Sequence, residues 1–499
     1  MSEPASRPRD SSVTHEVAAT LRGLMARGEL RPGMRLPSER ALAARLSVSR
    51  VTVVRALARL RYEGLVHTRH GSGTFVATSD RLIDTVAARQ DRSAPAAVAG
   101  ADALDLRWAT TAGPADLADV VQAAVRDALP VALRGDGATT GSLGGLTGLL
   151  AGYLTRSGLP TSPGQLTLTS GAMTSLGLVL DVAGPAGRLA VTETPTYPGA
   201  LRILARRGRR TRGWPAGPAG WDPGHLDRLL RAGSPGVLYV QPDGHNPTGA
   251  AMPAAARDAA ARAAAAGWLV VTDETMRPLH LAGDPGPSLA AIDHRVIVVS
   301  SLSKTVWGGL RLGWIRAPAA VTRQLRNAAV ATGAGPGALD QITAARLLPM
   351  LDQVIQRRTR LLAENLQHLE HRLRGLAAAG PAIRWHRPAG GITLWLDLHP
   401  RSSYEVVREC ARLGVLLEPA STYATDGRDD RHLRIPFTLP PPALDQVAGT
   451  LTAILLCRTA MSRWGDESAA VQRPRGAGPA GPWGHRGPVR PGRGMGREG

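Results

Sequence analysis

The chain has 499 residues, of which 43% are hydrophobic, and it carries a formal net charge of +20. This length predicts more than one domain, and the positive charge favours a polyanionic partner, nucleic acid first. No signal peptide or membrane-length apolar stretch is recognisable, so we expect a cytoplasmic protein without membrane contact. Cys410 and Cys457 lack metal-ligand spacing, which predicts a reduced compartment and no metal site.

The first compact unit is expected over residues 12–77, after a disordered stretch at 1–11. Apolar residues at helical spacing predict a first helix, and Ser38 and Ser49 are suitable N-caps for a second and a third. Two short β-prone pieces follow and are joined by a glycine-containing turn. Three helices and a tight hairpin are the outline of a winged helix-turn-helix, which binds DNA.

The third helix is the expected recognition helix. With Val54 packed inward, Arg50, Thr52 and Arg55 point outward, where arginine suits guanine in the major groove. An ordinary solvated helix face is the alternative, and the hairpin that follows argues against it. The residues expected to contact DNA, on the two helices or at the hairpin tip, are Arg40, Ser49, Arg50, Thr52, Arg55, His70 and Gly71.

Composition divides the rest of the chain into three parts. Residues 78–104 are rich in Ala, Pro, Arg and Asp with weak periodicity, and we expect them to form a linker. Residues 105–460 alternate short apolar strands with helical stretches, which predicts an α/β domain whose mostly parallel sheet is covered on both faces. Residues 461–499 are rich in Gly, Pro and Arg and are expected to be a disordered basic tail. The most regular expected strands are 188–192, 237–240, 268–272 and 296–300.

The large unit contains the only lysine of the chain, Lys304, among 60 basic residues. An arginine cannot lose its proton near neutral pH and so cannot act as a nucleophilic amine. A lysine can, once desolvation or a neighbouring cation lowers its pKa. Chance survival of one lysine codon under a biased composition is the alternative, so the neighbourhood of Lys304 has to decide.

Groups suited to a phosphate surround this lysine in the sequence. Ser301 and Arg311 flank it, and a hydroxyl and a guanidinium are both good phosphate donors. A separate Ser-Gly-Ala run contains Gly171 and Ala172 and opens a helix. Backbone N–H groups at a helix N-terminus can cradle the same phosphate, because glycine allows close approach.

Four further residues are suited to an aromatic ring and an amino-acid ligand. Asp273 ends a strand and can pair with a ring nitrogen, Tyr197 can stack on the ring, and Asn246 can donate to a ring oxygen. Arg434 can clamp an α-carboxylate with two hydrogen bonds. A turn, a helix cap or a surface arginine would explain each residue alone. Their combination predicts pyridoxal 5'-phosphate (PLP), bound as a Schiff base to Lys304.

The N-terminal motifs carry a family resemblance. The runs Leu36-Pro37-Ser38-Glu39-Arg40, Ser49-Arg50-Val51-Thr52-Val53 and His70-Gly71-Ser72-Gly73-Thr74 resemble the DNA-binding domain of GntR-type regulators. Such domains act in pairs on two half-sites, so the resemblance implies a dimer on double-stranded DNA.

The large unit is similar to the fold-type I, aspartate-aminotransferase-like enzymes. The resemblance rests on Asn246-Pro247-Thr248-Gly249, on Asp273 and on Ser301-Leu302-Ser303-Lys304. It implies a mostly parallel central sheet and a smaller C-terminal α+β subdomain. A winged helix joined to such a domain resembles the MocR-type subfamily of GntR regulators. Its known members sense PLP or amino-acid-like effectors and form domain-swapped homodimers.

Two departures from the aminotransferase pattern bear on activity. Met276 stands where transaminases commonly carry a tyrosine, and residues 138–147 lack the Tyr and Leu-Arg that are usual there. Full transaminase activity and tight PLP binding are therefore in doubt. We expect a DNA-binding regulator that senses PLP or an amino-acid-like effector. An active aminotransferase with an accessory DNA-binding domain is the alternative, and a third possibility is a dimerisation scaffold that has lost the cofactor.

Overall fold

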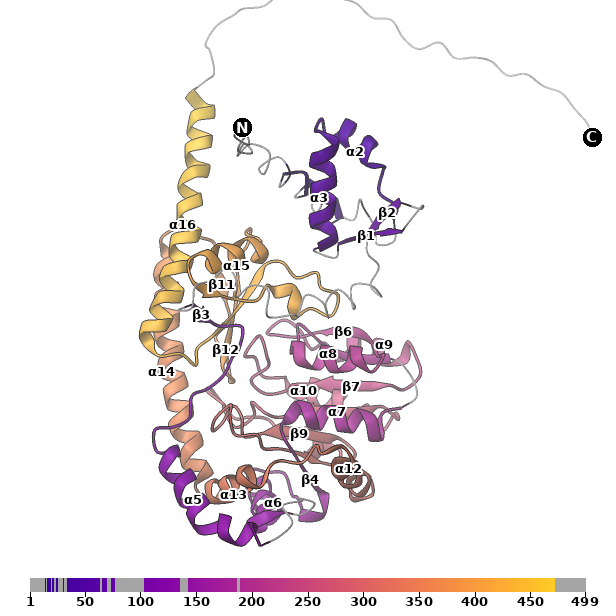
Figure 1. Cartoon of the computed structure of the whole chain (residues 1–499), viewed down its shortest axis with the longest axis vertical. Helices are drawn as coiled ribbons and strands as arrows, with labels where there is room; N and C mark the ends of the chain where they lie inside the picture. The colour runs from indigo at the N-terminus through magenta and orange to yellow at the C-terminus, as the bar shows by residue number, and fades with distance from the viewer. Residues whose placement is uncertain are drawn as a thin grey trace, which may run out of the picture.

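The computed structural model describes some positions between 14 and 30 and, continuously, residues 34–62, 65–69, 73–76, 103–134, 142–185 and 189–471. A helix-and-hairpin unit is followed by a large α/β domain and a smaller C-terminal subdomain (Figure 1). Within this described part, no helix is long and apolar enough to span a membrane. The predicted N-terminal stretch 1–11 and nearly all of the predicted linker 78–104 lie outside the described residues.

The N-terminal unit has the winged-helix arrangement that its sequence predicts. Its described elements are α2 (Glu39–Arg45), α3 (Arg50–Tyr62), β1 (Val66–Arg69) and β2 (Gly73–Val76). The two strands pair antiparallel, and the N–H of Leu36 donates to the carbonyl of Thr74 at 2.8 Å, which joins the residues before α2 to the hairpin. Leu42, Leu57 and Val76 pack into one core shared by the helices and the strands.

Both predicted N-caps are confirmed. The Ser38 hydroxyl accepts a hydrogen bond from the N–H of Ala41 at 3.2 Å, at the start of α2. The Ser49 hydroxyl accepts from the N–H of Thr52 at 3.1 Å, at the start of α3. Each cap satisfies a backbone donor that has no partner within its helix.

The orientation of α3 differs from the prediction. Thr52 is 4% exposed, whereas Val51 and Val54 are 57% and 37% exposed. The prediction that Thr52 points outward and Val54 inward is therefore wrong. Valines at three of the first five positions of α3 offer two competing apolar faces, and the face with Val53 is buried. A hydrogen bond of 2.8 Å between the Ser49 and Thr52 hydroxyls satisfies the buried threonine.

The large domain is built on a sheet of seven strands. They are β4 (Leu166–Thr169), β5 (Leu189–Thr194), β6 (Arg210–Pro215), β7 (Val237–Val240), β8 (Leu269–Asp273), β9 (Ile297–Ser301) and β10 (Gly313–Arg316). Their spatial order is β4-β10-β9-β8-β7-β5-β6. Only β10 runs antiparallel to its neighbours, β4 and β9, so the predicted mostly parallel sheet is confirmed.

Helices cover both faces of this sheet, as predicted (Figure 1). One face packs on α7 (Ala172–Ala183), α8 (Pro198–Arg206) and α12 (Ala319–Thr332). The opposite face packs on α9 (Pro223–Arg231), α10 (Ala254–Arg262) and α11 (Leu289–Ile292). Successive strand residues serve opposite faces, because side chains alternate along a strand: Tyr239 belongs to the first core and Val240 to the second.

A third helical group packs at the β4 and β10 edge of the sheet. It comprises α5 (Leu117–Ala132), α6 (Leu146–Arg156) and α13 (Ala338–Leu347), with the short 3-10 turns η1 (Leu143–Gly145), η2 (Pro163–Gln165) and η3 (Leu348–Met350) nearby. The long helix α14 (Leu351–Ala378) starts in this group and continues into the C-terminal subdomain.

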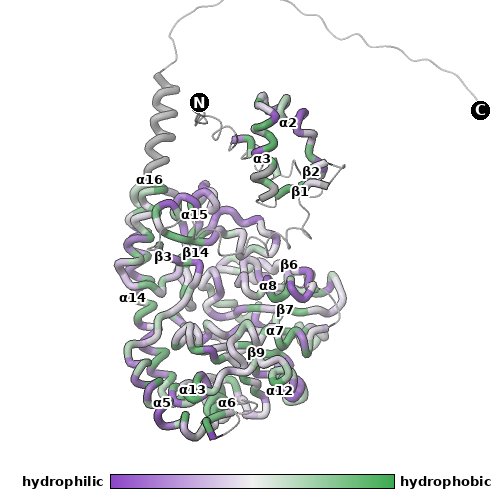
Figure 2. Tube along the Cα trace, in the orientation of Figure 1, coloured by the Kyte–Doolittle hydropathy of each residue, from purple (hydrophilic) through white to green (hydrophobic). Residues whose placement is uncertain are grey.

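The C-terminal subdomain has its own core and its own sheet, which confirms the predicted smaller α+β unit. Its further elements are β11 (Arg384–Trp385), β12 (Thr393–Asp397), α15 (Ser403–Arg412), β13 (Val415–Leu416), η4 (Ala420–Thr422), β14 (His432–Pro436) and α16 (Pro441–Val471). Hydrophilic and hydrophobic residues alternate along α14 (Figure 2), and its apolar residues face this core. A short strand from before the large domain, β3 (Leu104–Asp105), pairs parallel with β13.

The predicted start of a disordered tail at residue 461 is wrong. Helix α16 continues to Val471, so part of the predicted tail is helical. The reason is compositional: residues 461–471 hold a single glycine and no proline, whereas Pro474 and many later glycines and prolines oppose a helix. Residues 472–499 lie outside the described residues.

Candidate cofactor site and DNA-binding surface

Three predicted site residues follow neighbouring parallel strands. Asp273 is the last residue of β8, Lys304 comes after the end of β9, and Asn246 comes after β7. Parallel strands all end at one edge of their sheet, and α/β proteins bind ligands in the crevice at that edge. The topology therefore brings these residues to one edge.

The amine of Lys304 is buried among positive charges. Its Nζ donates a hydrogen bond to the carbonyl oxygen of Ala109 at 2.6 Å. Burial, followed by the charges of Arg434 and Arg311, lowers the pKa of this amine from 10.5 to about 8, against a smaller opposing effect of Asp273. A pKa near 8 leaves a useful neutral fraction at neutral pH, which is what a nucleophilic amine needs.

Donors suited to an anion gather at the start of α7. Gly171 has a φ of +140°, and a Cβ on it would lie 2.9 Å from Nη2 of Arg311, so a side chain there would displace the guanidinium. Ala172 is the first residue of α7, where backbone N–H groups have no partner within the helix. The hydroxyls of Ser301 and Ser303 lie 2.7 Å apart. These groups are the types that a phosphate requires.

The carboxylate of Asp273 is buried and bonded to uncharged donors. Its Oδ2 accepts from the Tyr239 hydroxyl at 2.9 Å, and its Oδ1 accepts from the N–H of Thr275 at 3.0 Å. Burial raises the pKa of Asp273 above its ordinary value, although these hydrogen bonds oppose the shift. A cationic ligand atom beside this carboxylate would supply the charge that its protein donors lack.

Tyr197 and Asn246 occupy positions suited to their predicted roles. Tyr197 is half-buried at the start of α8, and its ring lies so close to Gly199 that a Cβ there would overlap it. Asn246 is 6% exposed, and its Oδ1 has no hydrogen-bond partner among the described residues. A buried amide oxygen without a partner indicates that a ligand or water completes the site.

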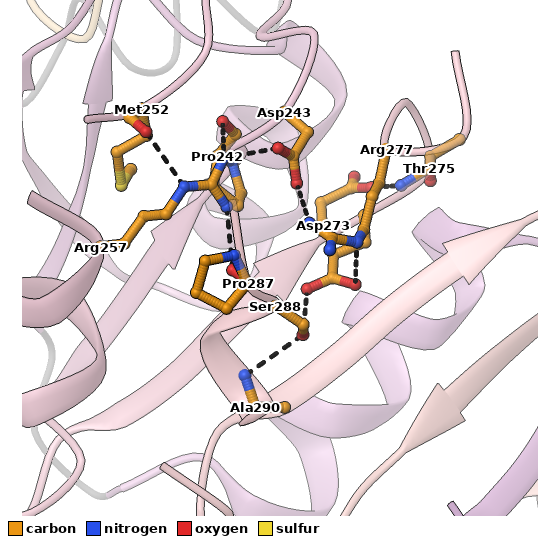
Figure 3. A network of polar contacts seen from close by, with 11 residues as sticks. Pro242, Asp243, Met252, Arg257, Asp273, Thr275, Arg277, Pro287, Ser288 and Ala290 are labelled. Atoms are coloured by element: carbon orange, nitrogen blue, oxygen red, sulfur yellow. Dashed lines mark hydrogen bonds and ion pairs between the residues drawn. The ribbon is translucent and has the colours of Figure 1, made fainter. Parts of the chain in front are cut away.

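A buried network of charges supports the loops that follow β7 and β8 (Figure 3). Asp243 accepts from Arg257 at 2.5 Å and from Arg277 at 2.9 Å. Arg277 also lies 3.9 Å from one oxygen of Glu274, whose other oxygen accepts from the Ser288 hydroxyl at 2.5 Å. Burial raises the pKa of Glu274, and the Arg277 charge opposes that shift.

Arg257 also binds the backbone of these loops. It donates to the carbonyl oxygens of Pro242 and Met252, both at 3.0 Å, and of Pro287 at 3.1 Å (Figure 3). Asn246 lies between Pro242 and Met252 in the chain. Arg257 of α10 thus fixes both ends of the loop that carries Asn246, the residue whose amide is predicted to bind the cofactor.

Arg434 enters the site from the C-terminal subdomain. It is 5% exposed and lies on β14, with its guanidinium carbon 5.2 Å from the ring centre of Tyr423. Its Nη2 donates to the carbonyl oxygens of Leu106 and Arg107 at 3.1 and 2.7 Å. Its Nε has no acceptor within the described part of the chain, so an anionic ligand could bind there.

The contacts of Lys304 and Arg434 reveal a segment that sequence reasoning missed, residues 104–112, here called the arm. Besides the carbonyls named above, the Thr111 hydroxyl of the arm donates to the backbone oxygen of Lys304 at 3.2 Å. Arg358 of α14 donates to the carbonyl of Ala112 at 2.6 Å. Backbone carbonyls carry no sequence signature, so no pattern could have identified these contacts.

The predicted DNA-contacting residues have mixed outcomes. Arg40 and Arg55 are exposed on α2 and α3. The Arg50 side chain is 73% exposed, although it pairs with Glu39 at 3.2 Å. Thr52 is buried and does not reach the surface.

The remaining residues predicted to contact DNA are a helix cap and two residues of the hairpin turn. Ser49 caps α3, while His70 and Gly71 lie outside the described residues. Sequence reasoning missed Val51 and Val54, which stand exposed beside the arginines of α3. Their place on the solvent face could not be read from a helix with two apolar faces.

Tyr239 and the ion-paired network were also missed. Tyr239 stands in an otherwise aliphatic strand, Val-Leu-Tyr-Val, and this pattern predicts only core packing. Arg257 lies in an alanine-rich helix, where an arginine is normally exposed. The side chain of Arg257 is nevertheless only 2% exposed.

Two family models match the chain. The model described as bacterial regulatory proteins of the gntR family matches residues 13–76. The model described as aminotransferase class I and II matches residues 114–451.

Curated relatives of this chain are named as transcriptional regulators. The pyridoxine biosynthesis transcriptional regulator PdxR of Corynebacterium glutamicum is 31% identical over 367 residues, which cover 72% of this chain and 77% of that protein. The transcriptional regulator TauR of Rhodobacter capsulatus is 28% identical over 470 residues, which cover 87% and 94% of the two chains.

Solved structures resemble the larger part. The α-aminoadipate aminotransferase LysN of Thermus thermophilus, crystallised with N-(5'-phosphopyridoxyl)-L-leucine, superposes with a TM-score of 0.66. The superposition covers 75% of this chain and 97% of that enzyme at 24% identity, so it shows a shared fold.

Proposed function

Because this chain belongs to the MocR-type subfamily of GntR regulators, we propose that it is a DNA-binding transcription regulator that holds PLP and senses PLP or an amino-acid-like effector. The observation that carries the proposal is the buried amine of Lys304, with a pKa lowered to about 8, in a chain that also has a winged helix. In this proposal residues 12–77 bind DNA, residues 105–460 hold the cofactor, and residues 78–104 connect them.

The residues at the sheet edge fit PLP. Gly171 leaves room for the Arg311 guanidinium beside the start of α7, which suits a phosphate. Asp273 is a buried carboxylate with uncharged donors, which suits a protonated ring nitrogen. The Oδ1 of Asn246 has no partner within the described part of the chain, so its orientation is not fixed by a bond at that atom, and its Nδ2 group would be the donor to a ring oxygen.

When bound, PLP supplies a carbonyl group that condenses with amines and a ring that withdraws electrons. Lys304 would contribute a fraction of neutral amine at neutral pH, because burial and two nearby arginines disfavour its proton. Asp273 would hold a proton on the ring nitrogen. The Tyr239 hydroxyl donates to that carboxylate and would keep it in place, and the ring of Tyr197 would stack on the cofactor ring.

The effector in this proposal carries a carboxylate and an amine. Arg434 has a buried Nε without an acceptor among the described residues, and a guanidinium binds a carboxylate through two parallel hydrogen bonds. The amine of the same ligand then competes with Lys304 for the cofactor. An α-amino or ω-amino acid has both groups. If binding at Lys304 alone is enough to change DNA binding, PLP itself is the effector.

The DNA surface in this proposal is the exposed face of α3. Arg50 and Arg55 can reach guanine or phosphate, and Val51 and Val54 can contact thymine methyl groups in the major groove. GntR-type domains act in pairs, so we propose a cytoplasmic homodimer that binds a two-part operator, with the domain-swapped arrangement of the subfamily. Light scattering of the purified protein measures the dimer directly.

An absorption spectrum with added PLP tests the cofactor. A band near about 420 nm is expected for the wild type and is expected to be lost in Lys304→Ala. Circular dichroism of both proteins controls for folding. No band in either protein would overturn the cofactor proposal and leave the large domain a scaffold.

Selection of random duplexes by the full-length protein tests DNA binding. We expect a two-part consensus, weaker binding by Arg50→Ala, and a strong loss of affinity with added salt. Arg228→Ala, at an exposed position of α9, is the matched control and should bind as the wild type does. Retention of the random pool without enrichment would contradict a sequence-specific regulator.

An active aminotransferase is the second candidate, and one observation favours it. With a pKa of about 8, Lys304 can both accept and return a proton near neutral pH, as transamination requires. Incubation with a panel of amino acids and 2-oxoglutarate separates the candidates. Multiple turnovers would support the enzyme, and a single stoichiometric spectral change would support the sensor.

A further inference from the structure

The arm, residues 104–112, links the cofactor site to the rest of the chain. It begins where the connection from the winged helix ends, and its strand β3 pairs with β13 of the C-terminal subdomain. The N–H of Leu104 donates to the carbonyl of Gly414 at 2.8 Å, and the N–H of Leu106 donates to that of Leu416 at 2.9 Å. Because the arm is covalently continuous with that connection, a displacement of β3 moves the end of the segment that leads to the DNA-binding domain.

Two cations of the site hold the arm. Nζ of Lys304 donates to the carbonyl of Ala109 at 2.6 Å. Nη2 of Arg434 donates to the carbonyls of Leu106 and Arg107 at 3.1 and 2.7 Å. The first of these residues is the predicted anchor of PLP, and the second is the predicted anchor of a carboxylate.

The chemistry of the proposed ligands competes with these contacts. Condensation of the neutral Lys304 amine with an aldehyde would form a C=N bond and release water, which carries the aldehyde oxygen and both amine hydrogens. The nitrogen would then carry no N–H, or a single one after protonation, in place of the three of the ammonium, so its hydrogen bond to Ala109 would be lost or contested. A carboxylate that takes two donors of Arg434 likewise competes with the carbonyls of Leu106 and Arg107 for the same guanidinium.

We propose that the arm is the coupling element of this regulator: ligands of Lys304 and Arg434 displace residues 104–112 from these cations and so alter DNA binding. This inference rests on the function proposed above. A ligand shifts a conformational equilibrium only through a difference in its affinity for two states. Here the difference comes from hydrogen bonds that the ligand must replace. Linkage also requires that DNA binding change the affinity for PLP by the same factor.

Two side chains outside the ligand chemistry also hold the arm. Thr111 is 3% exposed and donates to the backbone oxygen of Lys304, while Arg358 donates to Ala112. Thr111→Val keeps the shape and removes the hydroxyl, so it should loosen the arm without removing an anchor of PLP. Thr110→Val, at the exposed neighbouring position, is the matched control.

Hydrogen exchange of the full-length protein, measured by mass spectrometry with and without PLP, reports on the arm. We expect the amides of Leu104 and Leu106 to exchange at least about tenfold faster with PLP bound, because β3 is released from β13. Exchange in α9, which contributes no residue to the proposed site, should stay unchanged and serves as an internal reference. An arm whose exchange is unaffected by PLP, in a protein that shows the absorption band, would overturn the proposal.

DNA affinity with and without PLP measures the coupling itself. Using the duplex selected above, we expect a change of about 5- to 150-fold on adding PLP to the wild type and to Thr110→Val. The ratio should move toward one in Thr111→Val while its absorption band persists. Equal ratios in all three proteins would overturn the coupling role. Loss of the absorption band in the wild type is a different result, because it removes the proposed cofactor and the arm proposal with it.

Discussion

Asp243 and Asp273 are buried carboxylates near the ends of neighbouring strands, and they differ in the charge of their hydrogen-bond partners. Asp243 accepts from two arginines, at 2.5 and 2.9 Å. Asp273 accepts from a tyrosine hydroxyl and a backbone N–H, and burial raises its pKa. Within the described residues, no ion pair compensates Asp273 as the arginines compensate Asp243.

This difference separates structural charges from those that await a ligand. A buried charge is costly unless it is paired, and a fully paired carboxylate has little left to offer a cofactor. Asp273 remains undercompensated, so a cationic ring nitrogen gains the whole interaction. The paired network around Asp243 instead fixes the loops that carry the ligand-binding groups (Figure 3). The same substitutions at the two positions should therefore have different consequences.

The largest effect should come from breaking the paired carboxylate. Asp243→Asn leaves Arg257 and Arg277 without a full countercharge, and it should lower the free energy of unfolding by about 3–5 kcal/mol. Urea unfolding of the PLP-free protein measures this value. The identical change Asp273→Asn is the control, and it should not lower the free energy of unfolding near neutral pH, because it removes a charge that burial disfavours. Equal losses at the two positions would refute the comparison.

Asp273→Asn should instead weaken PLP binding, by about 10- to 100-fold, because the ring nitrogen loses a charge-assisted hydrogen bond. Titration with PLP, followed by absorbance, gives the dissociation constant. In the PLP-free protein the raised pKa of Asp273 has a further consequence. Wild-type stability should fall relative to the variant as the pH rises through that raised pKa, and the two should converge below 3.8, the ordinary value. An unchanged dissociation constant would place the cofactor elsewhere.

Glu274 is less fully paired than Asp243 and more so than Asp273. Its substitution should therefore change the free energy of unfolding less than Asp243→Asn does. It has one arginine at 3.9 Å and a serine hydroxyl at 2.5 Å. Glu274→Gln keeps an acceptor for Ser288 and loses only the distant charge, so we expect a loss of about 1 kcal/mol in the free energy of unfolding. Thermal and urea unfolding of Glu274→Gln and Asp243→Asn, measured side by side, would check the order of the two stability losses. A loss as large as that of Asp243→Asn would show that charge pairing at Glu274 had been underrated.

The smallest expected effect is on the pH dependence of PLP attachment, which the arginines near Lys304 influence. The rate of PLP attachment to Lys304 should rise with pH and level off above a midpoint near 8, because only the neutral amine reacts. Arg434→Met removes one of the two cations that lower this pKa, so the midpoint should move upward while burial keeps it below 10.5. Stopped-flow absorbance measures the midpoint. The exposed Arg228→Met should leave it unchanged, and a downward shift in Arg434→Met would contradict the stated cause.

The sequence was most informative where a polar residue follows an apolar run. Asp273 ends one short buried strand and Lys304 follows another, and the structure brings the ends of these parallel strands to one sheet edge. The cup at Gly171 was only weakly indicated, because glycine is also a common N-cap of ordinary helices. These inferences depend on local order along the chain, which a sequence displays directly.

The failures share a different physical origin. Thr52 and Val54 were misplaced because α3 has two apolar faces, and only contacts with the rest of the winged helix select one of them. Arg257 and the arm were missed because most of their contacts involve backbone carbonyls. A carbonyl is present at every residue, so its role depends on the tertiary fold and not on residue type.

The burial of Arg257 also has a consequence for how this domain opens and refolds. Its guanidinium joins Pro242 and Met252, at the two ends of one loop, to Pro287 of another loop, so the two loops share one point of attachment. Neither loop can detach without exposing the same buried charge. They should behave as one cooperative unit, whose amides exchange through a common opening event with a single free energy. The loop that carries Asn246 should thus become ordered together with the loop at Pro287.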